Sequence, residues 1–113
     1  MSLCEVRTIG GIMIVAMPPQ IDHVVALTLE RELRDLAESR PEALFCDFSA
    51  SKYISSSGLR VILATAKIVK GAGGRFGIFS LAPFVVHIIS VSGFTPLIAI
   101  YENEDAALRA VSG

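Results

Sequence analysis

The sequence lacks the charge imbalance and the long hydrophobic runs that would assign it to several common protein classes. Its 113 residues carry ten basic and eleven acidic side chains, a formal net charge of −1, and neither sign is gathered into a block. Phosphate neutralisation supplies most of the affinity of nucleic-acid binders, so the lack of a basic face argues against that function. No stretch reaches the roughly 18 uninterrupted apolar residues typical of a membrane-spanning helix, so we expect no direct membrane insertion.

Motifs for metal binding and for catalysis are also missing. The two cysteines, Cys4 and Cys46, form neither a CxxC pair nor a metal-ligand spacing, and Cys46 lies in an apolar run that favours a buried side chain. His23 and His87 each lack an acidic or cysteine companion at ligand spacing, so we expect no metal, no cofactor and no catalytic histidine. The N-terminus carries Glu5 where a secretory signal would be apolar, which predicts a soluble cytoplasmic protein.

The chain does contain a regular alternation of short apolar runs and amphipathic stretches. Hydrophobic residues make up 52% of the sequence, enough for the core of a single domain over residues 1–113. Two strands separated by Gly10-Gly11 predict a hairpin, and a helical pattern capped by Asp22 follows it. The predicted order is β-β-α-β-α-β-α-β-α. Strands that alternate with helices imply an α/β fold with a largely parallel sheet.

The remaining boundaries follow from local signals. We expect Gly71 to form a left-handed cap at the end of the second helix, Gly93 to end the third, and Asn103 to cap the fourth. The predicted strands cover residues 4–9, 12–17, 43–48, 75–81 and 96–101.

Three serines and a glycine, residues 55–58, stand where the third strand is followed by the second helix. This junction lies at the carboxyl edge of a parallel sheet, where open α/β sheets bind their ligands. The first-turn amides of a helix lack intrahelical partners, and the helix dipole favours negative charge there. Spacing alone favours a helix cap, with an exposed neighbouring hydroxyl open to modification. A serine nucleophile is disfavoured, because G-x-S-x-G is absent.

Residues 47–63, "DFSASKYISSSGLRVIL", resemble the signature of the STAS domain, and more specifically of the anti-sigma factor antagonists. Tyr53 and Ile54 stand at the aromatic-apolar pair of that signature, and residues 55–59 at its Asp-Ser-Ser-Gly-Leu core. "PQIDHVVALTLERELRDL" is similar to the first helix of the family and the loop before it, and residues 71–108 resemble its second half. The resemblance implies a STAS-like fold, a small mixed sheet with helices packed mainly on one face, and a regulatory protein without enzymatic activity.

The resemblance also implies a mechanism. In the antagonists, the serine just before the glycine is phosphorylated by an anti-sigma factor that is also a serine kinase of the histidine-kinase-like ATPase type. By motif position this serine is Ser57. The unmodified protein would bind the kinase and release a sigma factor, phosphorylation would end that complex, and a phosphoserine phosphatase would reset the switch. The implied partner surface comprises Asp22, Ser55, Ser56, Ser57 and Gly58. A homodimer is possible as well.

The sequence departs from the family pattern at two positions. The acid that usually precedes the two serines is Ser55 here, and Pro19 replaces the glycine of the loop before the first helix. Loss of the acid would weaken kinase docking or change which kinase acts. An alternative is therefore an unphosphorylated STAS scaffold, or a transporter-associated regulatory subunit that docks through residues 84–91. Asp22 is either a helix cap or a partner contact, and Gly58 serves either close approach by a partner or backbone packing.

Overall fold

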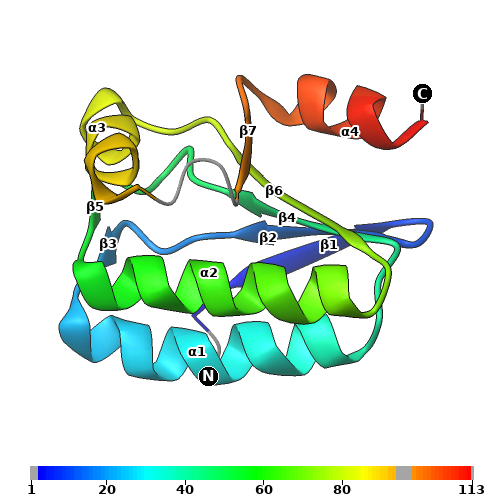
Figure 1. Ribbon diagram of the computed structural model, residues 1–113, viewed down its shortest axis with the longest axis horizontal. Helices are drawn as coiled ribbons and strands as arrows, with labels where there is room; N and C mark the ends of the chain where they lie inside the picture. The colour runs from blue at the N-terminus through cyan, green and yellow to red at the C-terminus, as the bar shows by residue number, and fades with distance from the viewer. Residues whose placement is uncertain (1–2, 94–97, 113) are drawn as a thin grey trace.

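The chain folds around a five-stranded mixed sheet with the strand order β1-β2-β4-β6-β7 (Figure 1). The computed structural model describes residues 3–93 and 98–112. β1 and β2 are antiparallel, and every other neighbouring pair is parallel. The strands are β1 (Glu5–Ile9), β2 (Ile12–Ala16), β4 (Ala43–Asp47), β6 (Arg75–Phe79) and β7 (Ala99–Tyr101).

The hairpin between β1 and β2 forms where the paired glycines predict it. Ile9 pairs with Ile12, so Gly10 and Gly11 form a two-residue turn. Gly10 has a φ of 61°, a conformation that a residue without a Cβ adopts at little cost. The predicted hairpin is therefore confirmed.

The central strand β4 is buried on both of its faces. Its side chains alternate, with Leu44 and Cys46 in the core on one side of the sheet and Phe45 in the core on the other. This double burial explains the continuous apolar run in the sequence. Burial raises the pKa of the Cys46 thiol, and burial together with the charge of Glu32 raises the pKa of Cys4 to about 12. Both thiols therefore stay protonated at neutral pH, as expected for buried hydrophobes.

The helices are distributed unequally over the two faces of the sheet (Figure 1). Side chains from α1, α2 and α3 enter the larger core, whereas α4 buries Ala107 against the opposite face. The expected fold class, a small α/β domain with helices mainly on one face of a mixed sheet, is thus confirmed. The helices are α1 (His23–Glu38), α2 (Ser56–Gly71), α3 (Pro83–Ser92) and α4 (Glu104–Ser112).

Two short strands add to the predicted order of elements. β3 (Gln20–Ile21) and β5 (Tyr53–Ile54) pair in parallel as a separate two-stranded sheet. The Ser55 amide extends the pairing by donating to the Ile21 carbonyl oxygen at 2.8 Å. β3 leads directly into α1 and β5 into α2, so this small sheet holds the N-termini of the two long helices side by side (Figure 1).

The C-terminus of α2 differs from the prediction in its choice of glycine. Gly71 is the last helical residue, and Gly73 adopts the left-handed conformation with a φ of 89°. The amides of Gly73 and Gly74 donate to the carbonyl oxygens of Lys70 and Val69, which satisfies the last turn of the helix. The prediction of a left-handed Gly71 is therefore wrong by two residues.

The other caps are confirmed. Gly93 follows α3 with a φ of 80°, and the Asn103 side chain accepts a hydrogen bond from the Ala106 amide at 2.9 Å. The last strand begins at Ala99, later than predicted, and residues 96 and 97 of the prediction lie outside the described part of the chain.

Candidate functional site

The N-terminus of α2 is capped by the first of the three serines. Ser55 has an extended backbone, and its Oγ accepts a hydrogen bond from the Gly58 amide at 3.1 Å. Ser56 is exposed and Ser57 is half-buried in the first turn. Because Ser55 provides the cap, the hydroxyl groups of Ser56 and Ser57 are left for other contacts.

Asp22 has the equivalent place at the start of α1. Its Oδ1 accepts a hydrogen bond from the Val25 amide at 2.8 Å, which confirms the predicted helix cap. The residue is also exposed, and it follows β3, the strand that pairs with β5 in front of the serines. Its role as a partner contact stays a prediction.

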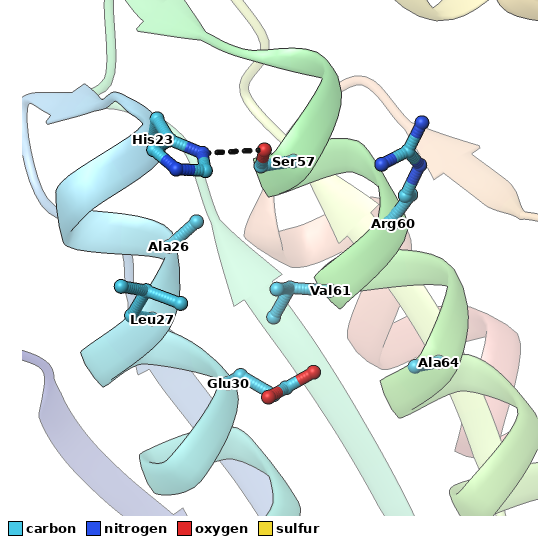
Figure 2. A pocket seen from close by; sticks show the side chains of 8 residues that line it. All are labelled: His23, Ala26, Leu27, Glu30, Ser57, Arg60, Val61 and Ala64. Carbon is cyan, nitrogen blue, oxygen red and sulfur yellow. Dashed lines mark hydrogen bonds between the residues drawn. The ribbon is translucent and has the colours of Figure 1, made fainter.

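Ser57 lies against His23, a residue to which the sequence assigns no role in the site. Its Oγ is 3.0 Å from Nδ1 of His23, the first residue of α1 (Figure 2). The imidazole nitrogen accepts from the hydroxyl group in one tautomer and donates to it in the other. The structure thus joins the candidate phosphorylation site to a histidine 34 residues earlier in the chain.

The small sheet explains this contact. Ile21 pairs with Ile54, His23 lies two residues after Ile21, and Ser57 lies three residues after Ile54. Parallel pairing therefore brings both helix starts to the same edge. Strands of two residues carry no periodic pattern, so the signal that would have revealed His23 is the pairing itself, which the sequence does not display.

A groove of about 320 Å³ runs between α1 and α2 from the His23–Ser57 contact (Figure 2). Leu27 and Val61 give it apolar walls, and Glu30 and Arg60 bring charge to it. Oε2 of Glu30 lies 3.9 Å from Nη2 of Arg34, one turn later on the same helix. Within the described chain, Arg60 has no acidic side chain at ion-pair distance.

Gly58 is buried and is not among the residues that line the groove. A Cβ at this position would lie 2.7 Å from Cγ2 of Ile21 and 2.8 Å from Cγ1 of Ile54. The lack of a side chain therefore lets α2 pack directly on the two-stranded sheet. The structure shows the backbone packing, and the role of Gly58 as a partner contact stays a prediction.

Apolar side chains near the helix starts stay exposed, and we call Val24, Leu27, Tyr53 and Phe84 the apolar rim. Val24 and Leu27 on α1 are 71% and 65% exposed. The ring of Tyr53 stacks on that of Phe84 at 6.3 Å between centroids. Ile54, by contrast, is buried in the core. The rim thus presents hydrophobic area beside an otherwise polar site.

The chemistry of the site is that of a hydroxyl group with a basic neighbour. A serine beside a histidine is the first part of a nucleophile–base pair, but hydrolases of that type also need a group that orients the base. In residues 3–93 and 98–112, no carboxylate hydrogen-bonds to His23. The same residues contain no group of three metal-ligating side chains.

Comparison with known proteins shows the family of the chain. The family model for the STAS domain matches residues 4–107. The chain belongs to the STAS domain family. BtrV of Bordetella bronchiseptica, provisionally named an anti-sigma factor antagonist, is 29% identical over 102 residues, which cover 90% of this chain and 88% of BtrV. The anti-sigma F factor antagonist of Paenibacillus polymyxa is 27% identical over 99 residues, 87% and 85% of the two chains.

A solved structure supports the same assignment. The crystal structure of an anti-sigma factor antagonist from Mycobacterium paratuberculosis matches with a TM-score of 0.88 and 29% identity, covering 97% of this STAS domain and 93% of that chain. Among the described residues of this STAS domain, no helix is long and apolar enough to cross a membrane.

The STAS motif gives the Ser55 position a physical meaning. This position, where the family usually has an acid, is the N-cap of α2. Serine and aspartate are both good N-caps, because each places an oxygen within reach of a first-turn amide. The substitution in this STAS domain therefore retains the cap and removes a negative charge next to Ser57.

Proposed function

We propose that this STAS domain, acting as one unit over residues 1–113, is an anti-sigma factor antagonist. The unmodified protein binds an anti-sigma factor that is also a serine kinase of the histidine-kinase-like ATPase type, and so frees a sigma factor. Phosphorylation of Ser57 dissociates this complex, and a phosphoserine phosphatase restores the binding form. The relatives named as antagonists, together with the half-buried serine at the motif position, support this proposal.

The observation that carries the proposal is the place of the Ser57 hydroxyl group. It lies in the first turn of α2, half-buried, while Ser55 already caps the helix. A phosphate there adds about −1.5 to −2 charges at pH 7, which a helix N-terminus accommodates. A partner surface fitted to a neutral hydroxyl group does not accommodate it. A loss of about 3 kcal/mol weakens a complex more than a hundredfold, so local charge is sufficient for the switch.

The apolar rim supports a protein as the partner. Val24 and Leu27 leave most of their apolar surface exposed, and both lie on α1, the helix that supplies His23. Protein interfaces commonly combine a hydrophobic centre with polar groups at the edge. Here Ser56 and Asp22 supply exposed polar groups beside the rim.

The test uses purified protein, candidate kinase partners and ATP. We expect mass spectrometry to find phosphate on Ser57 in the wild type and in Ser56→Ala, and no phosphate in Ser57→Ala. Ser56 is the matched control because it is the exposed neighbour in the same helical turn. Binding to the kinase should fall more than a hundredfold on phosphorylation. Absence of binding, or phosphate only on other residues, would contradict the proposal.

A second candidate is an unphosphorylated STAS module in a scaffold or beside a membrane transporter. The observation that favours it is the exposure of Phe84 and Val91 on α3, at 51% and 68%, which extends the apolar rim from Phe84 to a further apolar side chain on α3. Co-purification from the native cell separates the two candidates. Recovery of scaffold or transporter subunits without a kinase supports this function, whereas recovery of a kinase supports the first.

A further inference from the structure

We propose that a phosphate on Ser57 is held by the chain's own His23 and Arg60, which form an internal clamp. The inference rests on the proposed modification of Ser57 and adds two residues to it that the STAS signature at residues 47–63 does not mark for this role. The modified site is then an ion-paired cluster within the domain and not a free dianion at its surface.

The first half of the clamp is the His23 contact. The distance of 3.0 Å between Nδ1 and Oγ places the ring next to the oxygen that would carry the phosphate (Figure 2). Phosphorylation replaces the hydroxyl hydrogen with the phosphoryl group of ATP, with ADP as the leaving group and the proton released to the kinase or to solvent. The phosphate oxygens then only accept hydrogen bonds at pH 7. Nδ1 must therefore carry a hydrogen in the modified form, whereas a hydroxyl neighbour leaves either tautomer open.

The second half of the clamp comes from α2 itself. Arg60 lies three residues after Ser57, so their Cβ atoms are about 5–6 Å apart on one helix face. Side chains on a helix lean toward its N-terminus, and Figure 2 shows Arg60 reaching back to the level of Ser57, on the side away from His23. A guanidinium group in this position can offer two N–H donors to a phosphate. No acid among the described residues competes for Arg60 as an ion-pair partner.

The acids nearby are already engaged. Glu30 faces the same groove but lies 3.9 Å from Arg34, and the Asp22 carboxylate caps α1 through the Val25 amide. The groups left to contact the phosphate are therefore the Arg60 guanidinium and the His23 ring. A phosphatase has to break these contacts before it removes the phosphate, so the clamp lengthens the life of the modified state.

The test needs phosphoserine at position 57 without a kinase, which genetic incorporation of phosphoserine provides. The pH titration of its phosphorus NMR signal reports the second ionisation of the phosphate, which nearby cations shift to lower pH. We expect the midpoint in Arg60→Gln and in His23→Ala to lie about 0.3–0.5 pH units above that of the wild-type background. Arg31→Gln is the matched control, since it removes an exposed arginine from α1 away from the groove, and its midpoint should not move.

A second readout addresses His23 directly. When Ser57 carries phosphate, the nitrogen-15 signal of Nδ1 should be that of a protonated nitrogen, whichever tautomer the unmodified protein has. The clamp is overturned if either variant titrates like Arg31→Gln, or if Nδ1 of the phosphorylated protein gives the signal of an unprotonated nitrogen. Because no kinase takes part, these outcomes are independent of whether a kinase modifies Ser57, which the earlier assay decides.

Discussion

The starts of α1 and α2 are built alike and differ in charge. Each follows one strand of the two-stranded sheet, and each is capped by a side-chain oxygen, Asp22 in α1 and Ser55 in α2. The caps bond the Val25 and Gly58 amides at 2.8 and 3.1 Å. The comparison shows that helix capping needs an oxygen acceptor but no charge. The charge beside Ser57 can therefore change without loss of the helix cap.

The largest effect should come from the packing that brings the two starts together. Gly58→Ala places a Cβ within 2.8 Å of two isoleucine side chains, so we expect the free energy of unfolding to fall by about 1–3 kcal/mol. Chemical denaturation measures this change. Gly71→Ala is the control, because no atom lies within 4 Å of a Cβ there and alanine favours the helix. Equal stability of the two variants would contradict the packing role of Gly58.

Removal of either cap should cost less, and about the same at both helices. Asp22→Ala and Ser55→Ala each leave a first-turn amide without its acceptor, and we expect each to lower the free energy of unfolding by about 1 kcal/mol. Urea denaturation of both variants compares them directly. A loss at Asp22 several times that at Ser55 would show that charge, and not capping, dominates the start of α1.

Restoring the acid at the start of α2 should have a smaller effect of opposite sign. Ser55→Asp retains an acceptor and adds a negative charge at a helix N-terminus, so we expect a gain of about 0.3–1 kcal/mol at low ionic strength. The gain should decrease as salt is added, because exposed charges are screened. A loss of stability in thermal unfolding would break the equivalence of the two caps.

The smallest effect should come from His23, whose role we place in the modified protein. In the unmodified domain His23 is exposed, and its ring makes one hydrogen bond within residues 3–93 and 98–112, with Ser57. His23→Ala should therefore change the free energy of unfolding by less than about 0.5 kcal/mol. A larger loss in chemical denaturation would mean that the His23–Ser57 contact already stabilises the unmodified helix starts.

The sequence predicts the parts of this fold that carry strong local signals. The amphipathic pattern of α1, the buried run of β4 and the caps at Asp22 and Asn103 each have a chemical signature within a few residues. The choice between Gly71 and Gly73 was not predictable, because the two glycines, separated only by Ala72, tolerate the same conformation and the hydrogen bonds of the finished turn decide between them.

The candidate site was predictable only in part. Ser57 follows from motif position, and the N-terminus of α2 from helical periodicity. Arg60 lies three residues after Ser57 on the same helix, so its place beside Ser57 follows from helical spacing. His23 depends on how two helices lie against each other, which β3 and β5 determine through a pairing of two residues each. Contacts between segments so far apart in the chain leave no trace in local spacing, so His23 emerges only from the assembled structure.

The shortness of that pairing has a kinetic consequence. The starts of α1 and α2 are joined by two rungs of backbone pairing and the flanking amides of Lys52 and Ser55, whereas each neighbouring pair in the larger sheet outside β7 has five rungs. Proteins open locally where few bonds hold a segment, at a lower free energy than global unfolding. The Ser55 amide should therefore exchange its hydrogen with solvent sooner than the amides of β4. The starts of α1 and α2 would then open and close locally while the larger sheet stays folded.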